Sequence, residues 1–522
     1  MQEERGRSVR TSVVLCMNTT NDLNVLIRSR VPILVLDSID EAPAIKAILR
    51  ASGHATASGA CGTVDARATT GALPVFQWTA TDGLKRLDLS LPPQRTATDP
   101  IEVLKHIRAS NVAGIYILSD FHPYLSDPVA VRFLKDIAQE YAQCARTLIL
   151  VSAELTIPRE LEALTARCTL ALPDRDERRS IVEEIARQWV AAHPKEPVKA
   201  DRQALDLLVE NLAGLSVSEA QQVARQAIFA HGTIRITDIP AVTEAKYQLL
   251  NRHGILHYEP TTQGMADVGG FERFKDWLRK RDVAFDGSAP DLDVPKGVLL
   301  LGVQGCGKSL AARASAGILN VPLLSFDCAG LFDKYVGESE RNLRESLGSA
   351  DLMAPCVLWI DEIEKGFSSG ESDGGAARRV LGGFLTWLAE KRTRVFVVAT
   401  ANEIEQLPAE LVRKGRFDEI FFVDLPELEV RQQILDIHAR KRGISLDAPS
   451  LQALAQASEG FSGAEIEQAI VAALYTAHAQ HLSPNAQMIR SELAATKPLA
   501  VVMAEKVAAL RAWAQERTVP AE

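Results

Sequence analysis

Paired cysteines, long apolar runs and an excess of positive charge are all missing from this sequence. Seven cysteines occur among 522 residues, and no two of them have CxxC spacing. Such scattered thiols favour reduced cysteines over a disulfide framework or a zinc site. The apolar run Val13–Leu15 is too short for the core of a signal peptide, and no stretch approaches the length of a membrane span. These absences predict a cytoplasmic protein without a membrane partner.

The charge balance is acidic. Lys and Arg total 58 against 67 Asp and Glu, which gives a net charge of −9. Nucleic acids and anionic lipids would repel such a chain as a whole, so we expect neither as a general partner. The 47% of apolar residues is ordinary for a globular protein, and the length predicts two to four domains.

The first half of the chain alternates between strand-like and helix-like sequence. The strand candidates are Val31–Ser38, Pro74–Trp78, Gly114–Leu118, Thr147–Ser152 and Thr169–Leu172. A small and polar stretch at 51–72 is typical of a flexible loop. Alternating strands and helices predict an α/β module with a parallel sheet, and residues 173–245 then predict helices alone.

The second half repeats this plan. Strand-like runs occur at 296–302, 355–362, 394–402 and 419–426, and helix-like sequence follows. Four pairs of segments also match in order: 114–120 with 355–362, 147–161 with 395–411, 169–188 with 421–440, and 211–228 with 457–474. Four matches in the same order predict two homologous modules in tandem.

Residues 302–309, GVQGCGKS, fit the pattern GxxxxGK[ST] between an apolar strand and a helical run. The glycines let backbone N–H groups turn toward phosphate oxygens, and the helix N-terminus adds partial positive charge. Lys308 is predicted to reach the β- and γ-phosphates of ATP, and Ser309 to give its hydroxyl to Mg²⁺. Cys306, inside the loop, is expected to be a small apolar filler.

A second strand, VLWIDE at 357–362, ends in two carboxylates. A buried parallel strand would deliver them to the same sheet edge as the glycine-rich loop. Asp361 is predicted to hold Mg²⁺, and Glu362 to act as general base toward the attacking water.

These motifs, with ATAN at 399–402 and LVRKGRFDEIFFVDLP at 411–426, resemble those of the AAA ATPases over residues 267–482. The resemblance implies that Asn402 orients the hydrolytic water, and that Arg413 and Arg416 act in a neighbouring subunit's ATP site. It also implies a set of nucleotide-binding residues: Gly302, Val303, Gln304, Gly305, Cys306, Gly307, Lys308, Ser309, Leu310, Asp267, Val268, Gly269, Gly463 and Ala464.

The resemblance extends to assembly and to a protein substrate. Residues 334–337, KYVG, match the family's pore loop, in which Tyr335 would grip an extended polypeptide. The implied assembly is a hexameric ring of identical chains. Within the AAA proteins, the degenerate first half and the tail at 497–517 resemble the tandem family named for hypothetical chloroplast reading frame forty-six and its bacterial relatives.

The expected fold is therefore a P-loop AAA-type ATPase domain with a parallel sheet and a helical lid, preceded by a degenerate AAA-like α/β module with its own lid. The expected parts are a disordered tail (1–20), the first module (21–172), its lid (173–245), a linker (246–266), the ATPase core (267–425), its lid (426–482) and a C-terminal helical segment (483–522). The expected function is Mg-ATP hydrolysis coupled to remodelling of a protein partner. The alternative is a slow nucleotide-dependent switch that binds a partner.

The first module lacks the chemistry of the second. Its segment 33–49 has no glycine and no GK[ST], and it places Asp37, Asp40 and Glu41 where phosphates would lie. Carboxylates repel phosphates. Ser119 and Asp120 stand opposite Asp361 and Glu362. A scaffold, an oligomerisation surface and a substrate receptor remain open as roles for this module.

We predict that residues 21–245, prepared alone, bind no Mg-ATP, because the loop that would cradle the phosphates is acidic. Titration with a fluorescent ATP analogue, with the full chain as the positive control, measures this. Saturable binding by the fragment would refute the prediction.

Overall fold

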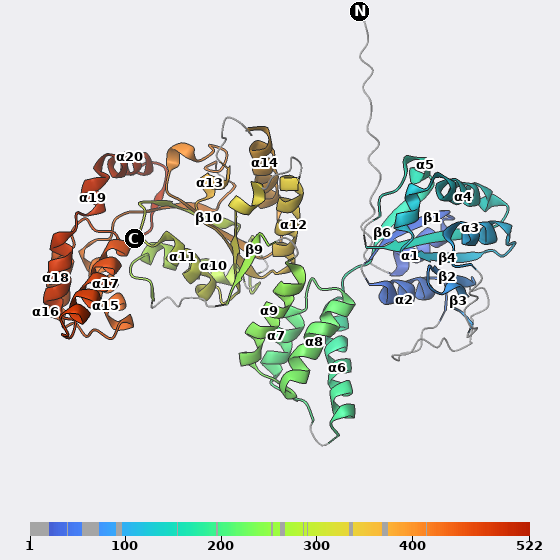
Figure 1. Ribbon diagram of the computed structural model, residues 1–522, viewed down its shortest axis with the longest axis horizontal. Coiled ribbons are helices and arrows are strands. Elements are labelled where there is room, and N and C mark those ends of the chain that lie inside the picture. The colour runs from blue at the N-terminus through green and yellow to red at the C-terminus, as the bar shows by residue number, and fades with distance from the viewer. Residues whose placement is uncertain are drawn as a thin grey trace, which may run out of the picture. The chain divides into compact units, whose positions relative to one another are not determined.

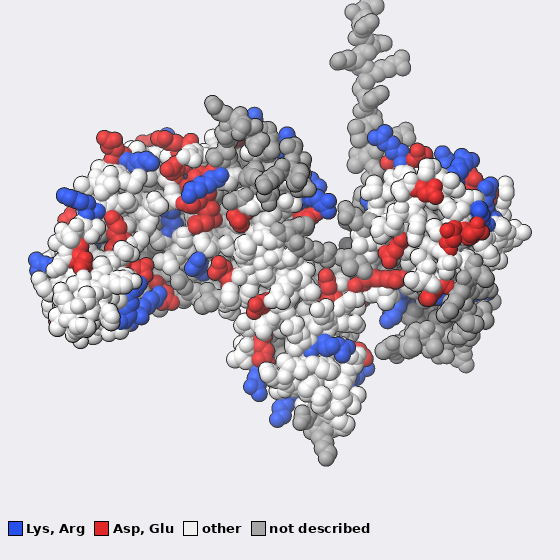
Figure 2. Space-filling model, in the orientation of Figure 1, with Lys and Arg blue, Asp and Glu red and all other residues white. Residues whose placement is uncertain are grey.

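The structure is a computed structural model that describes residues 20–38, 40–54, 73–89, 97–153, 155–194, 197–251, 254–260, 267–285, 287–289, 291–332, 338–367, 374–413 and 415–522 (Figure 1). The chain forms two compact units: residues 1–184 with 215–222, and residues 185–214 with 223–522. No described helix is long and apolar enough to cross a membrane. On the face drawn in Figure 2, acidic and basic side chains are interspersed, with wide areas that carry neither.

The first module is a six-stranded sheet with the order β3-β2-β4-β5-β1-β6. The strands are β1 (Ile33–Asp37), β2 (Val75–Thr79), β3 (Gly83–Arg86), β4 (Gly114–Ser119), β5 (Arg146–Ser152) and β6 (Thr165–Thr169). Neighbours run parallel except β2 and β3. Every residue of β4 and β5 is buried, as expected for strands covered on both faces.

Helices cover both faces of this sheet. They are α1 (Thr20–Arg28), α2 (Glu41–Ala51), α3 (Pro100–Ala109), α4 (Pro128–Gln139) and the short α5 (Arg159–Glu162). One apolar cluster joins α3 and α4 to the sheet, and a second joins α1 and α2 to it. The fold class predicted for this half is therefore confirmed.

Four helices follow the first sheet: α6 (Arg175–Ala192), α7 (Arg202–Asn211), α8 (Val217–His231) and α9 (Ile239–Leu250). Two strands of two residues each, β7 (Lys199–Ala200) and β8 (Thr233–Ile234), pair between them. All of α9 belongs to the second unit, where Tyr247 and Leu250 pack against the larger apolar core. The Tyr247 hydroxyl donates to the carbonyl of Leu256 at 2.6 Å.

The second module contains a seven-stranded sheet with the order β15-β14-β10-β13-β12-β11-β9. The strands are β9 (Leu256–Glu259), β10 (Gly297–Gly302), β11 (Leu323–Phe326), β12 (Cys356–Ile360), β13 (Val395–Ala401), β14 (Glu419–Val423) and β15 (Val519–Pro520). Around the sheet lie α10 (Glu272–Phe285), α11 (Lys308–Ile318), α12 (Glu338–Leu352), α13 (Ile363–Phe367) and α14 (Gly374–Glu390). Apolar clusters bury both faces.

A helical lid follows this core. Its helices are α15 (Leu428–Lys441), α16 (Ala448–Ala457), α17 (Gly463–Ala479) and α18 (Ala486–Ala495), and α19 (Leu499–Val502) and α20 (Ala504–Ala514) come after them. A separate apolar cluster holds α15 to α18 together. Ser462 caps α17 through a reciprocal bond pattern with Glu465, which fixes where this helix begins.

The two sheets share a core of five strands in the same order. The order β2-β4-β5-β1-β6 in the first module matches β11-β12-β13-β10-β14 in the second. Each sheet also carries an antiparallel strand at the same edge, β3 beside β2 and β9 beside β11. The topology agrees with the paired segments of the sequence.

The structure differs from the sequence-based expectations at the margins. The expected linker 246–266 contains the end of α9 and the strand β9, which pairs with β11. The last strand of the first sheet lies at 165–169, four residues before the predicted start at Thr169. The C-terminal segment is not wholly helical, because β15 joins the sheet beside β14. The expected disordered tail lies outside the described residues except for Thr20, which begins α1.

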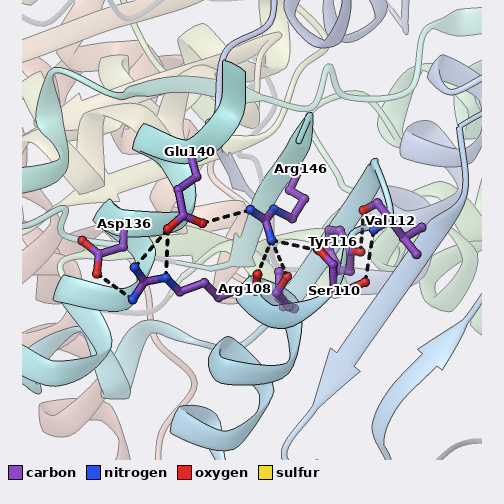
Figure 3. Close-up of polar contacts among 8 residues, drawn as sticks. Arg108, Ser110, Val112, Tyr116, Asp136, Glu140 and Arg146 are labelled. Carbon is purple, nitrogen blue, oxygen red and sulfur yellow. Dashed lines mark hydrogen bonds and ion pairs between the residues drawn. The ribbon is translucent and has the colours of Figure 1, made fainter. Parts of the chain in front are cut away.

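A buried arginine in the first module links the start of β5 to the end of α3 and to Glu140 (Figure 3). Arg146, at the start of β5, is 4% exposed, and one of its terminal nitrogens donates to the carbonyls of Ile107, Arg108 and Ser110 at 2.5 to 3.0 Å. These are the last carbonyls of α3, which have no partner within the helix. The other nitrogen pairs with Glu140 at 3.0 Å, and Glu140 also pairs with Arg108.

We predict that Arg146→Met destabilises the first module by about 3 kcal/mol, because helix-end carbonyls and a carboxylate lose their buried donor. Arg132→Met, which removes an exposed ion pair with Asp136, should cost less than about 0.5 kcal/mol. Hydrogen–deuterium exchange of the β4 and β5 amides in the full chain measures both. Equal exchange in the two variants would contradict the assigned role of Arg146.

Candidate active site

The glycine-rich loop connects β10 to α11 with close backbone contacts. A side chain at Gly302 would place its Cβ 2.0 Å from the carbonyl oxygen of Val423 in β14. Gly307 begins α11 in the left-handed region, at a φ of 89°, which glycine adopts without a steric penalty. The loop residues 304–307 lead directly into the N-terminus of α11. The first N–H groups of this helix have no partner within it and are available to an anion.

Lys308 is folded into this loop. Its side chain is buried, with 6% exposed, and its ammonium donates to the carbonyls of Gly302 at 2.9 Å and Val303 at 2.8 Å. Burial lowers the pKa of Lys308 to about 8. Between pH 8 and the ordinary lysine pKa the unfolded chain holds more protons, so this group opposes folding at low pH and its penalty is relieved as pH rises through that window.

Asp361 and Ser309 meet, as the sequence predicts for a shared magnesium site. The carboxylate of Asp361, at the end of β12, accepts from the Ser309 hydroxyl at 3.2 Å and from the Thr400 hydroxyl at 2.5 Å. One hydroxyl and one carboxylate are oxygen ligands of the kind that Mg²⁺ takes while it keeps water and phosphate in its shell. The donor set therefore fits magnesium bound together with a nucleotide.

Glu362 lies beside Asn402. Its two carboxylate oxygens accept from the Asn402 amide at 2.9 Å and from the Lys365 ammonium at 2.5 Å. Its backbone has a φ of 47°, which is uncommon for a residue with a side chain and recurs at functional sites. The Glu362 N–H donates to the Thr400 hydroxyl at 3.0 Å. Thr400 therefore positions both carboxylate residues, a role that the sequence analysis missed.

Glu364 was also not predicted from the sequence, although its carboxylate binds the backbone directly after β13. It is 1% exposed, and one oxygen accepts from the N–H groups of Asn402 at 2.8 Å and Glu403 at 3.3 Å. Its second oxygen has no described partner. Burial raises the pKa of this carboxyl. The letters DEIE place Glu364 three residues after Asp361, and this proximity was the only signal in the sequence.

A cavity of about 320 Å³ joins these groups to the lid. It is lined by Asp267, Val268, Gly269, Phe271, Gln304, Gly305, Cys306, Gly307, Lys308, Ser309, Leu310, Asp361, Glu362, Thr400, Asn402, Ile434, Ile437, His438, Gly463, Ala464 and Glu467. The lid reaches the loop directly, since the Ala464 N–H donates to the carbonyl of Gly305 at 3.0 Å.

One end of the cavity is polar and the other is mostly apolar. Lys308 and the carboxylates lie at the polar end, while Val268, Ile434 and Ile437 supply apolar surface of the kind that a purine base contacts. Burial lowers the pKa of His438, which lies 3.3 Å from the Glu467 carboxylate. Ile434, Ile437 and His438 together form the α15 wall of the cavity, and none of them was predicted from the sequence.

Some predicted residues lie elsewhere. Gly302 and Val303 do not line the cavity and act through their carbonyls on Lys308. Arg413 is exposed, and Arg416 donates to the carbonyl of Leu385 at 2.8 Å. Neither arginine is among the residues that line the cavity of its own chain. Tyr335 lies outside the described residues.

The parallel sheet, the glycine-rich loop and the lid define a P-loop domain of the AAA class. The profile of the ATPase family associated with various cellular activities (AAA) matches residues 298–425. Profiles of SpoVK-like AAA ATPases match the first half, the N-terminal domain at 19–170 and the second domain at 176–253.

Known relatives place the chain within this class more narrowly. It is 34% identical to the AAA domain-containing protein ycf46 of Trieres chinensis over 504 residues, covering 95% of this chain and 97% of the relative. Identity to ycf46 of Pyropia yezoensis is also 34%, over 95% of this chain and 98% of the relative. The chain therefore belongs to the ycf46 family of AAA-domain proteins. The crystal structure of the FIGL-1 AAA domain is 25% identical at a TM-score of 0.45, covering 52% of this chain and 95% of that one.

We predict opposite effects of two substitutions at Glu364. Glu364→Ala should lower the free energy of unfolding by about 2 kcal/mol, because the N–H groups of Asn402 and Glu403 lose their acceptor. Glu364→Gln keeps one acceptor oxygen and removes a buried charge, so stability at pH 7 should be equal or higher.

Urea unfolding followed by circular dichroism measures both. The wild-type carboxyl, with its raised pKa, contributes stability below the ordinary glutamate pKa that is lost as pH rises through the folded value. The advantage of Glu364→Gln should therefore shrink in acid. A pH-independent difference would contradict this assignment.

Proposed function

We propose that this chain hydrolyses Mg-ATP in its C-terminal module and couples hydrolysis to remodelling of a protein partner. The observation that supports the proposal most directly is that Lys308, Ser309, Asp361, Glu362 and Asn402 converge at one end of one cavity. These groups come from two strand ends and one helix start, far apart in the sequence. Their chemistry suits a triphosphate, a divalent cation and an attacking water.

Each residue has a defined task in this proposal. Lys308 leaves its carbonyl partners and binds the β- and γ-phosphates, while Ser309 and Asp361 hold Mg²⁺. When bound, the cation neutralises charge on the phosphate oxygens during transfer. Glu362 accepts a proton from the water, and Asn402, whose amide donates to the Glu362 carboxylate at 2.9 Å, orients that water. The adenine lies among residues 267–269, the α15 wall and the start of α17.

Arg413 and Arg416 are proposed to act in the site of a neighbouring copy. Neither lines the cavity of its own chain, and Arg413 projects into solvent. An arginine inserted from another subunit stabilises negative charge that develops on the phosphate during hydrolysis. This arrangement requires a homo-oligomer, for which we propose a hexameric ring in the cytoplasm.

Tyr335 is proposed to grip an extended polypeptide in the channel of that ring. This role is carried by the sequence resemblance at 334–337. The first module does not bind nucleotide in this proposal and contributes to the partner or to the assembly instead.

We predict that Arg413→Ala and Arg416→Ala each lower ATP turnover at least about 100-fold, because a cation that stabilises the transition state is lost. Wild-type turnover per chain should rise with protein concentration as the oligomer forms. Arg392→Ala, at another exposed arginine of the same module, should leave turnover unchanged. Phosphate release measures all of these.

Mixing two inactive variants tests whether the arginines act between chains. Glu362→Gln removes the general base but supplies both arginines, whereas Arg413→Ala keeps an intact site. Mixed oligomers should regain part of the activity if Arg413 acts on a neighbour. No recovery on mixing, together with turnover per chain that is independent of dilution, would exclude the ring mechanism.

A further inference from the structure

The two sheets differ at one edge. In the second module β14 is covered by β15, where Phe421 pairs with Val519 and Phe422 with Pro520. The Ala521 N–H also donates to the carbonyl of Phe422 at 3.0 Å. In the first module the corresponding strand is β6, which pairs with β1 on one side and with no strand of the described residues on the other. This edge is therefore available to another strand.

Thr169 of β6 holds the register position of Phe422. Equivalent backbone hydrogen bonds precede the two central strands and allow their residues to be matched. The Leu148 N–H donates to the carbonyl of Pro32, just before β1, at 2.9 Å, and the Val397 N–H donates to the carbonyl of Lys296, just before β10, at 3.0 Å. Counted from that bond, Asp37 corresponds to Leu301. Asp37 pairs with Thr169, and Leu301 pairs with Phe422.

The backbone of Thr169 faces the open edge. The carbonyl of Leu164 accepts from the N–H of Ile33 at 3.3 Å and so faces β1. In a parallel strand the N–H and C=O of one residue point to the same side, and successive residues alternate. Thr165, Arg167 and Thr169 therefore present their backbone groups to the outer edge, and Thr169 is exposed.

A groove of about 630 Å³ lies beside the end of this strand, against about 320 Å³ for the cavity of the second module. Its lining is mainly apolar and comes from α1, α2, the segment after β6 and α6. Leu172, in this lining, is 47% exposed. The lining also holds two basic and three acidic side chains: Lys46 and Arg50 on α2, Asp174 before α6, and Asp176 and Glu177 at the start of α6.

Phosphate chemistry does not fit this module. The carboxylate of Asp40 accepts from the Ser218 N–H at 2.9 Å, at the start of α8. In the second module the start of the equivalent helix, α17, contacts the glycine-rich loop through Ala464. An acidic side chain therefore holds the lid where the second module holds its phosphate-binding loop. Apolar lining and a free strand edge suit a peptide instead.

We propose that the first module binds an extended polypeptide segment, which adds to β6 as a parallel strand and places apolar side chains in the groove. The occupant is an unfolded segment of the protein partner, so the inference rests on the proposed remodelling function. The residue types expected in this segment are inferred from β15, which supplies Val519, Pro520 and Ala521 to the homologous edge. A short, uncharged, β-forming segment is the class that fits.

The test uses the full chain without nucleotide and fluorescein-labelled β-casein, an unfolded protein, as the probe. Fluorescence anisotropy should show saturable binding. Leu172→Glu, which puts a charge at the exposed rim of the groove, and Thr169→Pro, which removes an outward N–H, should each weaken binding at least tenfold. Val129→Glu is the matched control, because Val129 is 51% exposed in the same module and does not line the groove.

Hydrogen–deuterium exchange locates the contact. Casein should protect the amides of 165–172 in the wild type and in Glu362→Gln, but not in Leu172→Glu. Absence of binding, or protection confined to other segments, would overturn the inference. Protection of 165–172 in the free protein that disappears on deletion of residues 1–19, or on dilution, would assign the edge to the chain's own N-terminus or to a second copy and also overturn it.

Turnover separates this inference from the proposed function. Basal ATP hydrolysis should be unchanged in Leu172→Glu and Thr169→Pro, because neither residue lies in the ATPase module. Intact hydrolysis without casein binding would refute the peptide groove alone. Casein binding at 165–172 by a chain that does not hydrolyse ATP would refute the ATPase function and leave the groove standing.

Discussion

The hydrogen bonds of the Asp361 carboxylate hold the active site together. This one group joins the end of β12 to Thr400 on β13 and to Ser309 at the start of α11. Parallel strands bring their carboxyl ends to one edge of a sheet, so residues about 40 and 50 positions apart meet there. Thr400 in turn holds the N–H of Glu362. The proposed magnesium ligands, the proposed general base and the glycine-rich loop thus depend on the register of adjacent strands.

The first module has the same strand order without this set of contacts. Ser119 ends β4 and Asp120 follows it, with a positive φ of 50° that is close to the 47° of Glu362. The first module therefore has the same backbone turn as the second, although Ser119 stands where the second module has Asp361. Gln77 donates to Ser119 and to Glu41, so side chains that bond to each other occupy the sheet edge. Side chains of the first module itself therefore occupy the sheet edge at which the second module has its glycine-rich loop.

Sequence patterns anticipated most of the fold because central parallel strands are continuous apolar runs. The runs at 297–302, 356–360 and 395–401 were visible for that reason, and each is fully buried. Edge strands were missed or misplaced. β9 and β15 are short and only partly buried, so their strand character comes from pairing with β11 and β14 and leaves little trace in local composition.

Within the candidate site, residues in contiguous motifs were predicted and residues on separate elements were not. Lys308, Ser309, Asp361 and Glu362 were readable because the spacing of each motif carries its chemistry. Ile434 and His438 belong to a lid helix whose sequence resembles any amphipathic helix. Only the contacts of α15 with Gly269 and Gly270 turn one face of this helix toward the cavity.

By itself, the sequence determined that an α/β pattern is repeated in two halves of the chain and that only the second half carries a GxxxxGK[ST] loop, because both features are local patterns of glycine, charge and apolar runs. The tertiary structure alone decided that Thr400 bonds to Asp361 and Glu362, that Glu364 bonds to the backbone of Asn402, and that no strand of the described residues covers β6 where β15 covers β14. The physical reason is that these features join residues that are distant in the chain, either by hydrogen bonds between strand ends or by strand pairing at a sheet edge. No local sequence pattern specifies which distant segment makes such a contact.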